Sequence, residues 1–188
     1  MALPPQGVRE VHPVGVLSSQ QIHALLDADP PLVGGLADVD VQLQPNGFDL
    51  RVESVAAFAD GGQVGASDAE RRLAPTHDLE WSADGYLDLA PGIYLARLAE
   101  TVALPAGVMA LAKPRSSLLR CGVAVHNAVW DAGYAGRSQV QLAVYNPAGF
   151  RLGRGARIVQ MVFMTLEEAS ERLYAGRYQG EGLAEGQR

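Results

Sequence analysis

Two segments of the sequence combine side chains that can bind phosphate and activate water. Arg115-Ser116-Ser117, followed by Arg120, places two guanidinium groups around two hydroxyls, and both kinds of group donate readily to phosphate oxygens. Asp131 and Tyr134 lie in Trp130-Asp-Ala-Gly-Tyr-Ala-Gly136, a hairpin-like turn that follows an apolar stretch. A carboxylate beside apolar walls can act as a general base toward water, and a phenol ring can pack on a sugar.

Two further polar residues lie next to apolar residues. Asp49, in Gln44-Pro-Asn-Gly-Phe-Asp-Leu-Arg51, is a candidate for holding a hydrated Mg²⁺, because magnesium prefers carboxylate oxygen, water and substrate phosphate to an all-protein cage. Gln160 lies in a strongly apolar segment, so its amide needs a partner, either a backbone group or a ligand.

Each candidate also has a structural interpretation. The Arg115-Ser116-Ser117 turn could cap a helix, with Arg120 in a salt bridge nearby. Asp131 could serve only its turn while Tyr134 packs in the core, since Asp and Gly are common turn residues. Asp49 could pair with Arg51 or another cation. Taken one at a time, the segments therefore leave both interpretations open.

The elements that must position these residues are mostly short strands. One N-terminal helix is predicted over residues 17–26, where Ser18 or Ser19 can cap apolar residues at helical spacing. After the Pro- and Gly-rich tract 27–35 the helical period largely disappears, and short segments follow that alternate apolar with polar residues between Gly, Pro, Asn or Asp. This pattern predicts a compact all-β barrel or sandwich. Residues 59–72 predict a surface excursion, and the Gly-rich residues 174–188 are either a frayed end or a tail that closes over a phosphate.

Composition limits the classes of partner. With 188 residues, we expect one domain over 1–188, with 1–14 and 183–188 flexible. The net charge of -6 disfavours nucleic acid and anionic membranes, so any phosphate site must be a local basic cluster. A single cysteine and four scattered histidines argue against disulfides and a zinc-dependent deaminase site. No leader-like or membrane-spanning stretch is visible, and we expect a cytoplasmic protein.

In their order and spacing, these segments resemble the dCTP deaminase/dUTPase superfamily. The resemblance extends from about Gly15 to Gly182, and the opening Leu17-Ser-Ser-Gln-Gln-Ile looks like the first helix of the deaminase-type members. Five motifs carry it: Gln44-Pro-Asn-Gly-Phe-Asp-Leu-Arg51, Arg115-Ser-Ser-Leu118, Asp131-Ala-Gly-Tyr-Ala-Gly136, Arg157-Ile-Val-Gln160 and Tyr178-Gln-Gly180.

The resemblance implies a mostly β, distorted jelly-roll barrel of the dUTPase type with a short N-terminal helix. It also implies a homotrimer with sites at subunit interfaces that bind a deoxynucleoside triphosphate with Mg²⁺. Asp131 would orient the attacking water, Asp49 would assist the metal through water, and Tyr134 would pack under the deoxyribose. The residues that the resemblance implies in substrate binding are Arg115, Ser116, Ser117, Arg120, Asn127, Tyr134, Gln160, Tyr174, Arg177 and Gln179.

One position separates the two activities of the superfamily. Deaminase members need a glutamate on the strand after the hairpin to shuttle protons, and the equivalent residue here is Ala143, whose methyl group cannot do so. Hydrolysis requires only a metal, phosphate ligands and an oriented water. The segment 129–142 looks most like the archaeal-type dUTPases. We therefore expect dUTP hydrolysis to dUMP and pyrophosphate, which removes dUTP and supplies dUMP for dTTP synthesis.

Two alternatives stay open at this point. The first is a dCTP deaminase, monofunctional or bifunctional, which ammonia release from dCTP would reveal. The second is a non-catalytic dNTP-binding regulatory protein, which has no need of a water-orienting carboxylate at Asp131. Arg137, Gln139 and Glu181 depart from the superfamily pattern and bear on the tail contacts and the metal geometry.

Overall fold

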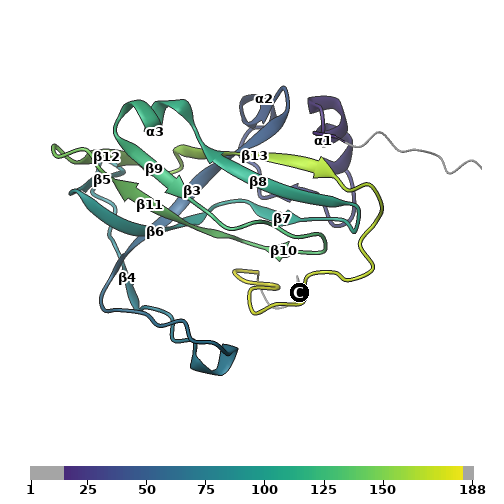
Figure 1. The fold of residues 1–188 in the computed structure, drawn as a ribbon. Helices are drawn as coiled ribbons and strands as arrows, with labels where there is room; N and C mark the ends of the chain where they lie inside the picture. The colour runs from purple at the N-terminus through teal and green to yellow at the C-terminus, as the bar shows by residue number, and fades with distance from the viewer. Residues whose placement is uncertain (1–14, 184–188) are drawn as a thin grey trace, which may run out of the picture.

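The structure is a computed structural model that describes residues 15–183, and it is built around a barrel-like β-sheet (Figure 1). The helices are α1 (Ser19–Leu26), α2 (Val39–Gln42), α3 (Ser116–Arg120) and the 3₁₀ turn η1 (Asp68–Glu70). The strands are β1 (Val33–Gly34), β2 (Leu43–Gln44), β3 (Gly47–Phe58), β4 (Thr76–Asp78), β5 (Tyr86–Leu89), β6 (Gly92–Leu98), β7 (Thr101–Ala103), β8 (Val108–Pro114), β9 (Val123–His126), β10 (Ala135–Gly136), β11 (Gln139–Val144), β12 (Phe150–Gly153) and β13 (Arg157–Thr165).

The main sheet has the strand order β8-β13-β3-β6-β11-β9, and all its strand pairs are antiparallel. Its two ends, β8 and β9, pack against each other, so the sheet nearly closes on itself. A smaller sheet, β1-β7-β10, and the pair β5-β12 complete the fold. The predicted mostly β barrel is confirmed.

Alternation along the strands places the core inside the barrel. On β13 the buried residues include Ile158, Met161 and Phe163, which form one core cluster with the fully buried Phe48 and Leu50 of β3. Side chains on a strand point alternately to its two faces, and β8 shows this pattern, with Val108, Ala110 and Ala112 buried. β3, β11 and β13 also contain runs of consecutive buried residues. Burial of these large apolar groups is the main force that holds the barrel together.

The predicted N-terminal helix is confirmed as α1. Ser18 is its N-cap: the Ser18 hydroxyl accepts from the backbone N–H of Gln21, and the Gln21 side chain accepts from the Ser18 N–H, which completes a capping box. Ile22 is fully buried and anchors the helix on the barrel. Within residues 15–183 no helix is long and apolar enough to cross a membrane.

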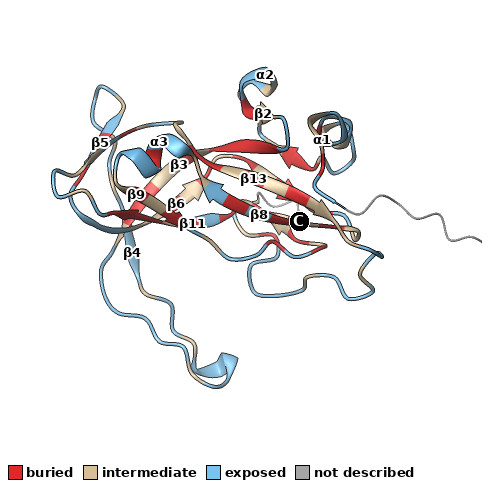
Figure 2. Cartoon of the chain, turned by 45° about the horizontal axis from the view of Figure 1, so that its top comes forward, coloured by how far each residue is buried: buried red, intermediate tan, exposed pale blue. Residues whose placement is uncertain are grey.

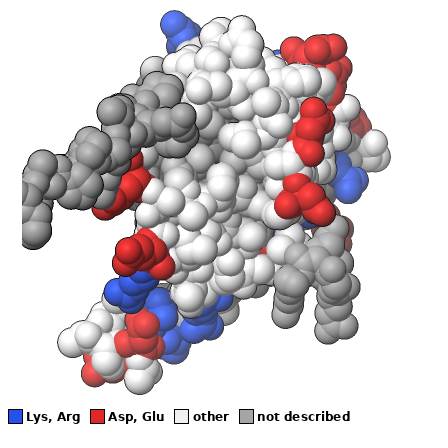
Figure 3. All heavy atoms as spheres, turned by 90° about the vertical axis from the view of Figure 1, so that its right-hand side faces the viewer, with Lys and Arg blue, Asp and Glu red and all other residues white. Residues whose placement is uncertain are grey.

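An arm between β3 and β4 projects away from the barrel (Figures 1 and 2). It contains the whole of the predicted surface excursion 59–72, and its residues are largely exposed. A bridge between Gln63 and Arg72 and the turn η1 give it local structure. Charged side chains gather on the arm and at the edges of the face in Figure 3, whereas the centre of that face carries few. The expectation of flexible ends falls on residues outside the described range, apart from Leu183.

Candidate active site

Adjacent strands bring two arginines to one buried carboxylate. β13 lies between β8 and β3, so Arg115 at the end of β8 and Arg157 at the start of β13 both reach Asp49 on β3. Arg115 Nε lies 2.8 Å and Arg157 Nη1 lies 3.1 Å from the same oxygen, Asp49 Oδ2. The Asp49 side chain is only 2% exposed. Burial raises the pKa of Asp49, and the positive charges of Arg115 and Arg157 oppose that rise.

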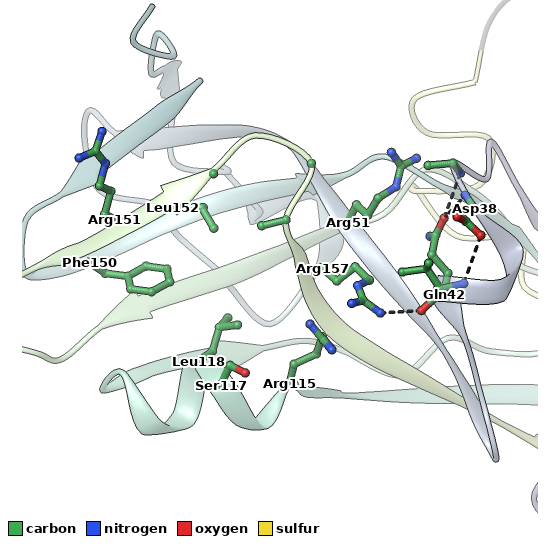
Figure 4. Close-up of a pocket in the computed structure, with 15 residues that line it drawn as sticks. Asp38, Gln42, Arg51, Arg115, Ser117, Leu118, Phe150, Arg151, Leu152 and Arg157 are labelled. Carbon is green, nitrogen blue, oxygen red and sulfur yellow. Dashed lines mark hydrogen bonds between the residues drawn. The ribbon is translucent and has the colours of Figure 1, made fainter. Parts of the chain in front are cut away.

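The two arginines open onto a pocket of about 480 Å³ between α2, α3 and the β12–β13 turn (Figure 4). Ser117 of α3 lines the same pocket, as do the apolar side chains of Leu118, Phe150 and Leu152. Arg115 is the N-cap residue of α3, so the chain turns at this position from strand to helix. Guanidinium forks and a hydroxyl beside an apolar wall suit a ligand that carries both phosphate and an organic group.

A second buried ion pair supports the rim of this pocket. Glu100, 1% exposed, accepts hydrogen bonds from Arg51 Nε at 2.6 Å, from the Arg51 backbone N–H at 2.8 Å and from Gln42 Nε2 at 2.8 Å. Arg51 also donates to the Gly35 carbonyl. Glu100 could not be found from the sequence, because no motif surrounds it and its side-chain partners lie 49 and 58 residues away in the chain.

The hairpin that carries Asp131 is held by a chain of buried hydrogen bonds. Trp130 Nε1 donates to Ser138 Oγ at 2.6 Å, and the Tyr134 hydroxyl lies 2.9 Å from the same oxygen. Asp131 itself is exposed and lines a second pocket of about 480 Å³ with Tyr174. Burial raises the pKa of Tyr134, so its phenol stays protonated and can donate at neutral pH.

The C-terminal tail packs on this hairpin. The backbone N–H of Tyr174 donates to the Ala132 carbonyl at 2.9 Å, and that of Gly180 donates to the Ala135 carbonyl at 2.8 Å. Gly133 has φ +84°, and a Cβ there would lie 2.6 Å from the Leu173 Cβ, so only glycine permits this approach. The described part of the tail is thus an ordered cover of the hairpin, not the frayed end that its composition also allowed.

Side chains of the tail complete the contact. The Gln179 carboxamide accepts from the Ala135 N–H and donates to the Gly133 carbonyl, both at 3.0 Å. The Tyr134 hydroxyl donates to Glu181 Oε1 at 3.0 Å, and the Tyr134 and Tyr174 rings meet edge to face. Burial raises the pKa of Glu181, and its hydrogen bond from Tyr134 opposes that rise.

Replacing Gln179 with alanine should release the tail while leaving the barrel folded. The change removes both carboxamide hydrogen bonds, each worth about 1 kcal/mol, and local opening then requires less free energy. We expect trypsin to cleave after the exposed Arg177 several-fold faster than in the parent protein. Gln139→Ala, an exposed glutamine on β11, is the matched control. Equal cleavage rates for Gln179→Ala and the parent protein would show that these two hydrogen bonds do not hold the tail.

The structure places the predicted residues in two groups. Arg115 and Ser117 line the first pocket, whereas Asp131 and Tyr174 line the second, and the two pockets share no lining residue. Of the other positions, Ser116, Arg120 and Arg177 are exposed, and Gln160 is half-buried on β13. Arg120 donates to the Ser116 carbonyl, and Asn127 donates to the Ala112 carbonyl. Tyr134 of the hairpin bonds to Glu181 of the tail, and Gln179 of the tail bonds to the hairpin backbone. Asp49 follows the ion-pair alternative, with Arg115 and Arg157 as its partners instead of Arg51.

Comparisons with known proteins bear on this arrangement. A model of the dCTP deaminase-like family matches residues 16–166, which include both arginines, α3 and the hairpin. The chain belongs to the dCTP deaminase-like family. The predicted superfamily is thereby confirmed, and the family match includes four of its five motifs in full.

Members of this family with sequences similar to the chain include archaeal proteins. It is 44% identical over 168 residues to a probable deoxyuridine 5'-triphosphate nucleotidohydrolase of Methanosarcina mazei, a match that covers 89% of this chain and 98% of the relative. It is 40% identical over 170 residues to the protein of the same name from Archaeoglobus fulgidus, covering 90% and 99%.

A solved structure supports the fold. The 2'-deoxycytidine 5'-triphosphate deaminase from Agrobacterium tumefaciens superposes with a TM-score of 0.65 at 28% sequence identity. The superposition covers 82% of this chain and 49% of the deaminase, so the chain corresponds to about half of that protein's length.

Proposed function

We propose that this protein is a dUTP diphosphatase, which hydrolyses dUTP to dUMP and pyrophosphate. The observation that carries the proposal is the 40–44% identity, over almost the full length, to relatives named as deoxyuridine 5'-triphosphate nucleotidohydrolases. The reaction removes dUTP and supplies dUMP for dTTP synthesis. The pocket with Arg115, Arg157 and Ser117 supports phosphate binding in a chain whose net charge is -6.

Ala143 supports hydrolysis over deamination. It lies on β11 between β6 and β9 and is 1% exposed. By the resemblance of the motifs, this is the position at which deaminases of the family carry their glutamate. A buried methyl group cannot deliver a proton to a pyrimidine ring. The hydrolytic reaction instead uses Asp131, which lines an open pocket and is proposed to orient water toward the α phosphorus.

The separation of the two pockets supports sites between subunits, and the resemblance implies that the assembly is a homotrimer. Within residues 15–183 of one chain, the arginine pocket and the Asp131 pocket share no lining residue. Hydrolysis requires the phosphate ligands and the water-orienting carboxylate at one substrate, so we assign them to neighbouring subunits. The weakly charged centre of the face in Figure 3 is compatible with contact between copies.

Magnesium is proposed as the cofactor. Residues 15–183 contain no group of three or more Asp, Glu, His or Cys side chains that could hold a metal. A site with so few protein donors fits Mg²⁺ that is bound mainly by the triphosphate and water, because magnesium commonly takes only one or two protein carboxylates. A bound ion would supply charge neutralisation at the phosphate oxygens. Asp49, proposed to assist it through water, is paired with two arginines.

We propose the cytoplasm as the location of the protein, consistent with the single, unpaired Cys121.

One assay tests the proposed function. Purified protein with Mg²⁺ is given dUTP, dCTP and dTTP separately, and both pyrophosphate and ammonia are measured. We expect pyrophosphate from dUTP, little from dCTP or dTTP, and no ammonia. Ammonia from dCTP would instead identify a deaminase, and tight nucleotide binding without either product would identify a dNTP-binding regulatory protein.

A further inference from the structure

Arg157 has the position of a ligand-binding arginine, although the resemblance assigned substrate binding only to Gln160 within the motif Arg157-Ile-Val-Gln160. Its side chain is 27% exposed, lines the same pocket as Arg115 and Ser117, and shares the Asp49 Oδ2 atom with Arg115. In Figure 4 the two guanidinium groups lie beside each other, between Ser117 and Gln42. Such a pair of forks presents more donors than one carboxylate oxygen can accept.

We propose that Arg157 is a second phosphate-binding arginine and that Asp49 is the positioning residue that holds Arg115 and Arg157 in the pocket. The inference rests on the proposed function only for the identity of the phosphate compound, which is the triphosphate of dUTP. It adds Arg157 to the residues that contact substrate, and it gives Asp49 a role that needs no metal.

Electrostatics explains why the pair needs Asp49. Two guanidinium groups side by side repel each other, and a buried carboxylate between them offsets that repulsion. The three groups together carry a formal charge of +1, which leaves the pocket positive for an anion. Because Asp49 is almost fully buried on a central strand, it cannot follow the arginines outward, so both stay in place before the ligand arrives.

The other charged groups of the pocket do not take this role. Arg51 uses Nε for Glu100 and Nη2 for the Gly35 carbonyl, so it is committed to the fold. The Asp38 carboxylate caps α2 by accepting from the backbone N–H groups of Asp40 and Val41. Arg151 also lines the pocket, but it pairs with Asp84 and Asp88. Arg115 is anchored on Asp49 through Nε, and Arg157 is anchored on Asp49 and on the Val41 carbonyl through one atom, Nη1. Each of these two arginines is thus held through a single nitrogen and lines the pocket.

Substitution of Arg157 tests its role through binding. The probes are the non-hydrolysable α,β-imido analogue of dUTP, inorganic tripolyphosphate and deoxyuridine, measured by calorimetry with Mg²⁺. For Arg157→Gln we expect about 10- to 100-fold weaker binding of the analogue and of tripolyphosphate, as for loss of a charge-assisted hydrogen bond. Deoxyuridine binding should not change. The affinity of Arg157→Lys for the analogue should lie between those of the parent protein and of Arg157→Gln, because lysine keeps the positive charge but lacks the planar guanidinium fork.

Arg154→Gln is the matched control, since Arg154 is exposed in the β12–β13 turn and does not line the pocket. Loss of one positive charge there should leave all three affinities unchanged. Unchanged analogue binding in Arg157→Gln would overturn the proposal, and so would an equal loss of deoxyuridine binding, which would indicate a structural role. If wild-type protein binds tripolyphosphate but does not hydrolyse dUTP, the proposed function fails while the phosphate site stands.

Asp49→Asn tests the positioning role. We expect KM for dUTP to rise about 10-fold or more with a smaller change in kcat, because the forks are still present but no longer held. The double variant Asp49→Asn/Arg157→Gln should bind the analogue at most about threefold more weakly than Arg157→Gln alone. The reason is that the effects of two coupled residues do not add. Fully additive losses would overturn the positioning role. Should Asp49→Asn fail to fold, Asp49→Glu provides the same comparison with the charge kept.

Discussion

Replacing Asp131 with asparagine should lower kcat for dUTP about a thousandfold, while the affinity for the α,β-imido analogue changes little. Asparagine has nearly the same shape, but its amide cannot accept a proton from water. The exposed carboxylate of Asp131 lies beside Tyr174 in the second pocket and makes no ion pair there within the described residues. Its loss should therefore remove a group that acts on water without unfolding the hairpin.

Steady-state kinetics with dUTP and calorimetry with the analogue measure the two effects separately. Asp78→Asn, an exposed aspartate on β4, is the control for loss of one negative charge and should keep full activity. Preserved turnover in Asp131→Asn would remove Asp131 from its proposed role. Loss of binding together with turnover would place Asp131 among the substrate ligands instead.

Local sequence was sufficient to predict the elements that local physics determines. The helix α1 follows from a capping serine and apolar residues at helical spacing, and the strands follow from alternation between breakers. At Arg115 the sequence left a helix-capping turn open as an alternative, and α3 does begin at Ser116, although Arg115 is its N-cap residue and makes no side-chain capping bond. These features depend on residues that are near one another in the chain.

Features that depend on strand register could not be predicted in this way. Arg157 meets Asp49 across 108 residues because β13 pairs with β3, and that pairing also contains a register shift between Arg157 and Val159. Likewise, composition shows that the tail is Gly-rich, but it cannot indicate that Gln179 bonds to the backbone of Gly133 and Ala135. Long-range pairing is decided by the packed core as a whole and not by any short segment.

Glu100→Gln should lower the free energy of unfolding by roughly 3 kcal/mol. The Glu100 carboxylate accepts from three donors: Arg51 Nε, the Arg51 backbone N–H and Gln42 Nε2. Glutamine has one oxygen in place of two, and its NH₂ group would face a donor in a buried site. Arg51 would also lose its buried counter-ion, although its 23% exposure allows partial hydration and limits the effect.

Glu53→Gln is the matched control, because Glu53 also joins arginines, with Arg137 Nη1 at 2.6 Å and Arg97 Nε at 3.3 Å, but its side chain is 36% exposed. An exposed ion pair contributes about 0–1 kcal/mol, so Glu53→Gln should unfold close to the parent protein. Urea denaturation at one fixed protein concentration makes the comparison, since subunit association would shift the apparent stability. If both variants lose the same stability, burial is not what makes the Glu100 network important. A larger loss for Glu100→Gln would show that the rim of the arginine pocket depends on a carboxylate that water does not reach.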